Sequence, residues 1–166
     1  MKLILSPTGR LNDEIILEVH LNLKKIDPTI QGLEDPVLGP VRQFKKVINP
    51  FVQILHTGRY HWVCISSVGC SNGIVNLYDS LYRNVISKEV EEQAINQVVT
   101  DSFSRLNVVP IQQQRNGSDC GVFTAAFGTA LVHGVSPNLL EFHTTKLRNH
   151  LCACLRAGRM DMFPFL

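Results

Sequence analysis

Residues 116–134 read NGSDCGVFTAAFGTALVHG, and the fold prediction starts from this stretch. Its first part consists of turn-forming residues, whereas the rest is rich in Ala and Phe and almost free of charge. The pattern predicts a turn that leads straight into a helix over residues 121–133, buried nearly all round and ended by Gly134. Cys120 is therefore expected at the N-terminus of a buried helix.

The segments on both sides of this helix predict an α+β fold, a central mixed sheet flanked by helices. A first helix is capped by Asn12 and stopped by Asp27 and Pro28. The other expected elements are strands at 51–56, 60–67, 73–78 and 106–111, a helix at 87–99 with Val90, Ala94, Ile95, Val98 and Val99 on its apolar face, and an amphipathic helix at 144–156. Residues 29–50, rich in Pro and Gly, are interpreted as a surface connection with one short helical turn. The first three strands favour an antiparallel meander.

Length and composition indicate one soluble domain. The chain has 166 residues, 45% of them hydrophobic and 18% charged, so residues 1–166 are expected to form a single domain with its own core. Sixteen Lys and Arg against 14 Asp and Glu leave a net charge of +2, without the basic excess of nucleic-acid-binding proteins. The apolar runs are far shorter than the roughly 20 residues that span a bilayer. Neither nucleic acid nor a membrane is an expected partner.

The cysteines favour a reduced protein. There are five, an odd number without regular spacing, and residues 1–5 are too short for a signal peptide, so a cytoplasmic or nuclear location is expected. Cys152 and Cys154, with His143 and His150 nearby, suggest a metal site only by composition. Two residues that are two positions apart on a helix point about 200° apart. No metal and no cofactor are expected.

Cys120 has a physical reason to be reactive, because the N–H groups and the dipole at a helix N-terminus favour the thiolate. A cysteine nucleophile also needs a base and a group that orients the base. His61 opens one predicted strand and Asp79 closes the next, and antiparallel pairing places these two ends side by side. Considered singly, Cys120 is equally well a small core residue, His61 a strand-edge imidazole and Asp79 a turn carboxylate.

Attack on a carbonyl group also needs hydrogen-bond donors for the oxyanion that develops. The backbone N–H of Cys120 and the side-chain amide of a nearby glutamine are suitable donors. Three glutamines, Gln112, Gln113 and Gln114, precede the turn. Their residue type alone does not distinguish between them.

Four short motifs resemble the ubiquitin-like-protein protease family, which includes SUMO-deconjugating enzymes. They are His61-Trp62, residues 78–80 (YDS), Gln114 with residues 116–121 (NGSDCG), and residues 11–16 (LNDEII). The resemblance implies a papain-like cysteine protease fold in which His61 is the general base, Asp79 its orienting group, Gln114 the oxyanion donor and Cys120 the nucleophile. It also implies hydrolysis after the C-terminal Gly-Gly of a modifier, without a cofactor.

The same resemblance implies where the modifier binds. Trp62 matches a family tryptophan that covers the narrow channel for Gly-Gly. The substrate-binding residues implied in this way are Trp62, Arg10, Asn12, Asp13, Gly117, Ser118 and Asp119. Arg10 departs from the family pattern, because a second channel tryptophan usually stands directly before the Leu-Asn-Asp motif. SUMO is the expected modifier by family default and ubiquitin is the alternative, since no residue here decides between them.

Other functions could use the same residues. One is a catalytically dead module that still binds a ubiquitin-like protein, or a scaffold acting through residues 29–50. Others are a polyprotein-processing peptidase and an acetyltransferase, because Cys-His-Asp sites serve several acyl transfers. The presence of all four candidate catalytic residues favours an enzyme, which is expected to be a monomer.

Overall fold

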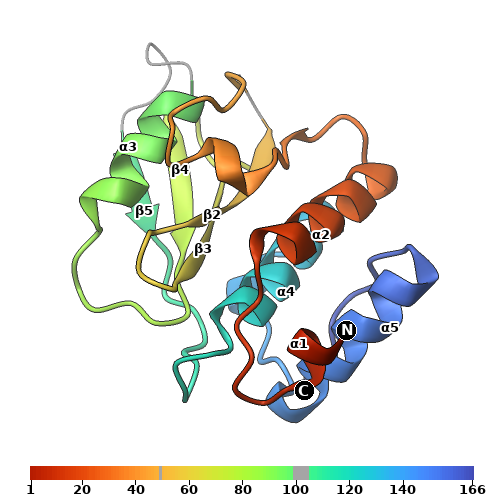
Figure 1. Ribbon diagram of the computed structural model, residues 1–166. Helices are drawn as coiled ribbons and strands as arrows, with labels where there is room; N and C mark the ends of the chain where they lie inside the picture. Colours follow the sequence, from red (N-terminus) through yellow and green to blue (C-terminus); the bar gives the residue numbers. More distant parts are fainter. Residues whose placement is uncertain (49, 99–104) are drawn as a thin grey trace.

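The strands form one five-stranded mixed sheet in the order β1-β2-β3-β4-β5 (Figure 1). The computed structural model describes residues 1–48, 50–98 and 105–166. The strands are β1 (Gln31–Gly32), β2 (Phe51–His56), β3 (Trp62–Ser66), β4 (Ile74–Tyr78) and β5 (Arg105–Val108). The predicted antiparallel meander β2-β3-β4 is confirmed, and β1 and β5 each pair in parallel with their neighbour. The predicted mixed sheet is thus present.

Helices cover both faces of the sheet. They are α1 (Lys2–Leu5), α2 (Asp13–Ile26), α3 (Lys88–Gln97), α4 (Cys120–Val132) and α5 (Leu147–Ala157), with single 3₁₀ turns at Pro36–Leu38, Pro137–Leu139 and Thr144–Lys146. Helix α4 contacts β2 and β3 on one side and α2 and α5 on the other, while α3 packs on the opposite face of the sheet (Figure 1). The sheet is therefore buried on both sides, which explains why its central strands are almost continuously apolar.

Side-chain alternation along the strands divides the core in two. Val52 and Ile54 of β2 point toward α4, whereas Phe51 and Leu55 of the same strand belong to the cluster under α3. All 13 residues of α4 are buried, as the composition of this segment predicts. No helix within the described residues combines the length and the apolar character needed to cross a membrane.

The helix boundaries follow local capping chemistry. The Asn12 side chain accepts a hydrogen bond from the backbone N–H of Ile15 at 3.0 Å, and Ser87 caps α3 in the same way. Gly134, with a φ of 79°, follows the end of α4 in the left-handed conformation that favours glycine. The predicted caps and the predicted end of the buried helix are confirmed.

The interpretation of residues 29–50 as a surface connection is wrong in part. The predicted helical turn is present at Pro36–Leu38, but this segment also supplies strand β1 and several buried residues, namely Ile30, Leu33, Pro36, Phe44 and Val47. Leu33 donates its backbone N–H to the carbonyl of Val52 at 2.8 Å, which ties the segment to β2. Its apolar residues follow neither helical nor strand spacing, so only the tertiary structure reveals that they are buried. Position 49 lies outside the described residues.

The predicted apolar face of α3 is also wrong at Ile95, which is 46% exposed. The helix instead buries Gln93 and Gln97 beside Val90 and Ala94. Gln97 is stabilised there because its side-chain amide donates to the side chain of Gln53 at 2.8 Å. The helix ends at Gln97, so Val98 follows it and bridges to Val47, and the predicted helical position Val99 lies outside the described residues.

Several predicted boundaries shift for local reasons. Strand β3 begins at Trp62 rather than at position 60, because a turn joins Thr57 to His61 and Tyr60 takes a positive φ of 58°. Strand β5 spans Arg105–Val108, two residues before Pro110, which has no N–H for a sheet. The last predicted helix divides into the turn Thr144–Lys146 and α5, and the short helix α1 was not predicted at all.

Gly121 allows the chain before α2 to lie directly on the start of α4. A Cβ atom at Gly121 would lie 2.9 Å from Cβ and Cγ of Leu11, which is too close without a backbone shift. We predict that Gly121→Ala lowers the free energy of unfolding by about 1–3 kcal/mol through overpacking. Urea unfolding measures this change.

Gly128→Ala is the matched control in the same helix. Its added Cβ would meet the nearest side chains, those of Leu23, Ile54 and Val52, at 3.5–3.7 Å, which are ordinary contacts. Replacing a helical glycine by alanine there should leave the protein as stable or stabilise it by about 0.5–1 kcal/mol. Equal urea midpoints for the two variants would contradict the packing argument.

Candidate active site

Cys120 is the first residue of α4 and is buried, with 1% of its surface exposed. Its Sγ lies 3.6 Å from the backbone carbonyl of Tyr60, in the turn that precedes β3. The left-handed backbone of Tyr60 is unusual for a tyrosine, and such strained residues are held in place only by their surroundings. The thiol thus lies at the N-terminus of a buried helix, as the sequence predicts. It also lies against the turn that precedes β3.

His61 and Asp79 meet as the strand pairing predicts. β3 and β4 run antiparallel, with Cys64 opposite Tyr78, so the residue before β3 lies beside the residue after β4. His61 Nε2 and Asp79 Oδ1 are 2.6 Å apart, and both side chains are mostly buried. Because Nε2 is bound to the carboxylate, Nδ1 is the ring nitrogen that remains for Cys120.

The electrostatics favour a thiolate and an imidazolium. Burial alone would lower the pKa of His61, but hydrogen bonds to Asp79 and to Cys120 outweigh it and raise the pKa to about 9. Burial alone would raise the pKa of the Cys120 thiol, but His61 and the backbone N–H groups of Trp62 and Gly121 lower it below its ordinary value. The site therefore favours the thiolate, the nucleophilic form of the cysteine.

Gln112 and Gln113 both hold neighbouring backbone. The Gln112 side chain accepts from the N–H of Phe142 at 2.6 Å and donates to its carbonyl at 3.1 Å. The Gln113 side chain donates to the carbonyl of Asp79 and accepts from the N–H of Tyr82, both at 2.9 Å. These two glutamines therefore tie the chain just before Gln114 to the backbone of Phe142 and to the turn after β4.

Gln114, the oxyanion donor implied by resemblance, is 6% exposed. Its Oε1 accepts a hydrogen bond from the hydroxyl of Ser80, and its Nε2 donates to the carbonyl of Asn116 at 2.7 Å. Ser80 belongs to the motif at residues 78–80 and directly follows Asp79, but the sequence assigns it no role of its own. A serine beside an aspartate is an ordinary turn pattern, so no local signal indicates this contact.

The turn before Cys120 is held from several sides. The Asn116 side-chain oxygen accepts from the backbone N–H groups of Ser118 and Asp119, both at 2.9 Å. Asp119 accepts from Arg148 of α5 at 2.8 Å, and the Ser118 hydroxyl donates to the carbonyl of Pro7 at 3.0 Å. The side chains of Ser118 and Asp119, which the resemblance implies in substrate binding, are thus engaged within the chain.

Arg148 was missed in the sequence. Besides Asp119, it donates to the carbonyls of Ile4 and Gly9 at 2.9 and 2.8 Å and to that of Ser118 at 3.1 Å. Its side chain is 13% exposed. It joins α5, the N-terminal segment and the turn before the cysteine, and no local pattern could indicate contacts with residues so distant in the chain.

Trp62 begins β3, whereas Arg10 lies in the segment before α2. Trp62 donates its indole N–H to the carbonyl of Leu11 at 3.0 Å. The Arg10 guanidinium carbon lies 5.4 Å from the centre of the Tyr60 ring, a cation–π contact, and a Cβ atom at Gly117 would be 3.9 Å from Arg10. The implied substrate-binding residues Arg10, Trp62 and Gly117 are therefore close to the residues around Cys120.

Asn12 and Asp13 border a groove next to Trp62. The groove has a volume of about 270 Å³ and is lined by Leu11, Asn12, Asp13, Pro36, Val37, Pro40, His56 and Trp62. The His56 and Trp62 rings meet edge to face with their centres 4.7 Å apart. The Asn12 side chain itself caps α2, so its established contact is structural.

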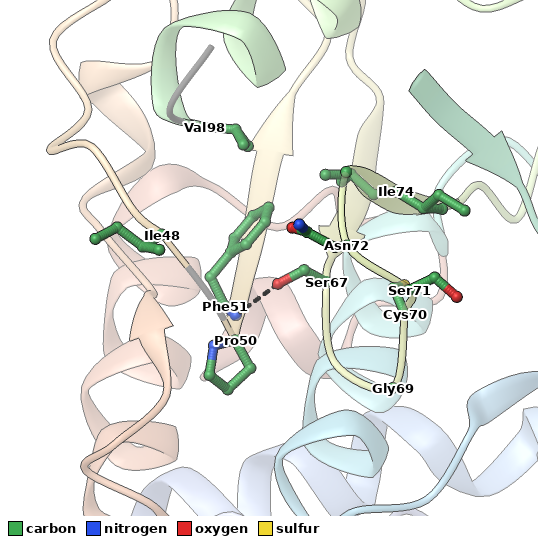
Figure 2. Close-up of a pocket in the computed structure, with 12 residues that line it drawn as sticks. Ile48, Pro50, Phe51, Ser67, Gly69, Cys70, Ser71, Asn72, Ile74 and Val98 are labelled. Atoms are coloured by element: carbon green, nitrogen blue, oxygen red, sulfur yellow. Dashed lines mark hydrogen bonds between the residues drawn. The ribbon is translucent and has the colours of Figure 1, made fainter. Parts of the chain in front are cut away.

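A separate cavity of about 450 Å³ lies at the other end of β3 and β4. Figure 2 shows its lining, including Phe51, whose N–H donates to the hydroxyl of Ser67 at 3.1 Å. Ser67 follows β3 and Ile74 begins β4, whereas His61 and Asp79 lie at the opposite ends of these strands. This cavity is not part of the site around Cys120.

In the part of the chain that the structure describes, no group of three or more His, Cys, Asp or Glu side chains could hold a metal ion. Cys152 and Cys154 point to different neighbours, as their helical spacing predicts. Cys152 Sγ lies 3.5 Å from the sulfur of Met1, and Cys154 Sγ lies 3.3 Å from His150 Nε2. The cysteines outside α4 therefore make their own separate contacts.

The Ulp1 protease family C-terminal catalytic domain matches residues 50–155, well over half of the chain. The match includes the meander, α4 and the four residues His61, Asp79, Gln114 and Cys120. The chain belongs to the Ulp1 protease family. The predicted family is thereby confirmed, although the motif at residues 11–16 lies outside the matched range, and the role of each residue in this chain stays a prediction.

Solved Ulp1-like structures share the fold. A SUMO protease Ulp1 whose catalytic cysteine is oxidised to a sulfonic acid is 14% identical, with a TM-score of 0.68 over 93% of this chain and 82% of the other. A Chaetomium thermophilum Ulp1-like SUMO protease catalytic domain is 22% identical, with a TM-score of 0.62 over 95% and 76%. The Xanthomonas campestris effector XopD bound to ubiquitin is 11% identical, with a TM-score of 0.60 over 90% and 93%.

These similarities confirm the predicted Ulp1-type α+β fold. At identities of 11–22% they establish the fold alone. No curated protein sequence matches the chain. The chemistry of this Ulp1-family site therefore has to be argued from its own residues.

We predict that Cys120 is the most reactive cysteine of this Ulp1-family domain at acidic pH. Because its pKa is lowered while burial raises the pKa of Cys64 and Cys70, iodoacetamide should modify Cys120 at least about tenfold faster than the other four at pH 6. Mass spectrometry of timed samples measures each rate.

His61→Ala is the matching variant. Loss of the imidazole removes the main group that lowers the Cys120 pKa, so the reaction at pH 6 should slow strongly and recover as the pH rises through the ordinary thiol range. Equal rates for all five cysteines in the unaltered protein would show that the thiol is not activated.

Proposed function

We propose that this Ulp1-family chain is a cysteine peptidase that cleaves after the C-terminal Gly-Gly of a ubiquitin-like modifier. It would release the modifier from target lysines or mature its precursor. The observation that carries the proposal is the hydrogen-bonded His61–Asp79 pair beside a thiol at the start of α4, with the pKa of the thiol lowered. A catalytically dead binding module would not need this polarised arrangement.

In the first half of the reaction, the Cys120 thiolate attacks the carbonyl carbon of the terminal glycine. The backbone N–H of Cys120 and the amide of Gln114 donate hydrogen bonds to the oxyanion. As the tetrahedral intermediate collapses, the C–N bond breaks and the His61 imidazolium gives its proton to the leaving amine. The products of this half are the free amine and a thioester on Cys120.

In the second half, neutral His61 accepts a proton from water, and the resulting hydroxide attacks the thioester carbonyl. The C–S bond breaks, the carboxylic acid of the modifier leaves, and the thiolate–imidazolium pair is restored. Asp79 keeps the ring oriented in both halves through its contact with Nε2. This cycle needs no redox step and no cofactor.

SUMO is the modifier that we propose first. A related structure is described as a C-terminal Ulp1 protease domain in complex with Smt3, the yeast orthologue of SUMO, and the XopD structure contains ubiquitin. Ubiquitin is therefore the second candidate. We further propose that residues 1–166 act as one monomeric domain in the cytoplasm or nucleus, with conjugated proteins rather than nucleic acid or membranes as partners.

The proposal is tested with SUMO and ubiquitin probes that carry an electrophile in place of the C-terminal glycine carboxylate. We expect a covalent adduct on Cys120 with at least one probe and none with Cys120→Ala, both identified by mass spectrometry. The probe that reacts identifies the modifier. A folded protein that reacts with neither probe would contradict the proposal and leave a binding module or another acyl transferase.

Gln114→Ala tests the oxyanion donor. Removal of one such donor should lower kcat by about 10²-fold or more. The rate of iodoacetamide modification of Cys120 should stay unchanged, because displacement of iodide develops no oxyanion. Cleavage of a fluorogenic modifier–amide substrate measures kcat, and undiminished turnover would show that another group forms the oxyanion hole.

A further inference from the structure

Ser80 joins the two sides of the candidate site. It is completely buried and directly follows Asp79 at the end of β4. Its hydroxyl is hydrogen bonded to Oε1 of Gln114, and its backbone carbonyl accepts from the backbone N–H of Gln114 at 2.8 Å. Ser80, which follows the Asp79 that pairs with His61, thus makes two hydrogen bonds to Gln114, the residue that we propose as oxyanion donor.

The neighbours of Gln114 determine which way its amide group faces. The carbonyl of Asn116 can only accept a hydrogen bond, so the amide nitrogen must lie on its side, at 2.7 Å. The amide oxygen must then face Ser80. Because that oxygen can only accept, the Ser80 hydroxyl is the donor of their hydrogen bond.

This orientation matters for an oxyanion donor. A primary amide has two N–H bonds, and the bond to Asn116 uses one of them. The second is free of hydrogen bonds to the described residues. If the amide rotated by half a turn, its oxygen would lie where its nitrogen lies now, beside the Asn116 carbonyl. The lone pairs of that oxygen would then take the place of the free N–H, and they would repel the developing negative charge instead of stabilising it.

We propose that Ser80 is a positioning residue that holds the Gln114 amide with its N–H toward the reacting carbonyl. The inference rests on the proposed function, because it concerns the oxyanion of that reaction. It adds a residue that acts through Gln114 without touching the substrate. Ser80 also lies in the turn that presents Asp79, so one turn sets both the base and the oxyanion donor.

Ser80→Ala is the test. Without the hydroxyl, the Gln114 oxygen loses its donor, and only the bond to the Asn116 carbonyl still orients the amide. We expect kcat to fall at least about tenfold, part of the effect of losing the donor itself, with KM changed less than about twofold. The rate and pH dependence of iodoacetamide modification of Cys120 should stay as in the unaltered protein. A purely structural disturbance would change both reactions.

Ser66→Ala is the matched control. Ser66 is also completely buried, and its hydroxyl donates to the carbonyl of Phe51 at 2.8 Å, at the end of β3 far from His61. This variant loses that bond and a second one, which the hydroxyl accepts from the backbone N–H of Val68 at 3.0 Å, so its stability should fall at least as much as that of Ser80→Ala. Its kcat should stay unchanged. Ser80→Cys, of nearly the same volume and with a weak S–H donor, serves if the alanine variant does not fold, and its kcat should fall less steeply.

A double variant separates Ser80 from Gln114. In the Gln114→Ala background, Ser80→Ala should cause no further loss of kcat, because the group that it positions is gone. Multiplied losses, or full kcat in Ser80→Ala, would overturn the inference while the peptidase proposal stands. Full kcat in Gln114→Ala would instead remove Gln114 from the proposed mechanism, and the role of Ser80 with it. The two failures can be told apart, because this one is seen in a variant that keeps Ser80.

Discussion

The burial of α4 on every side is the constraint on which the rest of the structure depends. Its 13 residues are all buried between β2 and β3 on one side and α2 and α5 on the other. A helix that is apolar all round cannot slide or rotate in such a position without exposing apolar surface or opening a cavity. Its first residue, Cys120, therefore has a fixed place against the turn before β3. The absence of a side chain at Gly121 lets the chain at Leu11 approach this point.

Burial also decides the chemistry, because each polar group near Cys120 has to find a partner in the protein. His61 interacts with Asp79 and with the Cys120 thiol, and these interactions raise the pKa of the imidazole to about 9 despite its partial burial. Asp119, which directly precedes Cys120 in the sequence, accepts hydrogen bonds from Arg148 of α5. The side chains of His61, Asp79, Asp119 and Arg148 are thus paired before any substrate arrives, and a preorganised site does not have to reorganise during the reaction.

The turn after β4 connects the parts of this site. Asp79 orients the base, Ser80 contacts the amide of Gln114, and Gln113 bonds back to the carbonyl of Asp79. Two chain segments more than 30 residues apart in sequence therefore behave as one unit around the thiol. Arg10 lies next to this arrangement, because its guanidinium group makes a cation–π contact with the ring of Tyr60.

The parts that could be predicted from the sequence depend on near neighbours in the chain. The apolar composition of residues 121–133 determines a buried helix, Asn12 and Ser87 determine the starts of α2 and α3, and the antiparallel pairing of adjacent strands determines that His61 meets Asp79. Only the tertiary structure decided the burial of Leu33, Phe44 and Val47, the exposure of Ile95, and the contacts of Arg148 and Ser80. Periodicity and capping report on residues a few positions apart, whereas these features arise from partners that lie far apart in the sequence and that only the folded chain brings together.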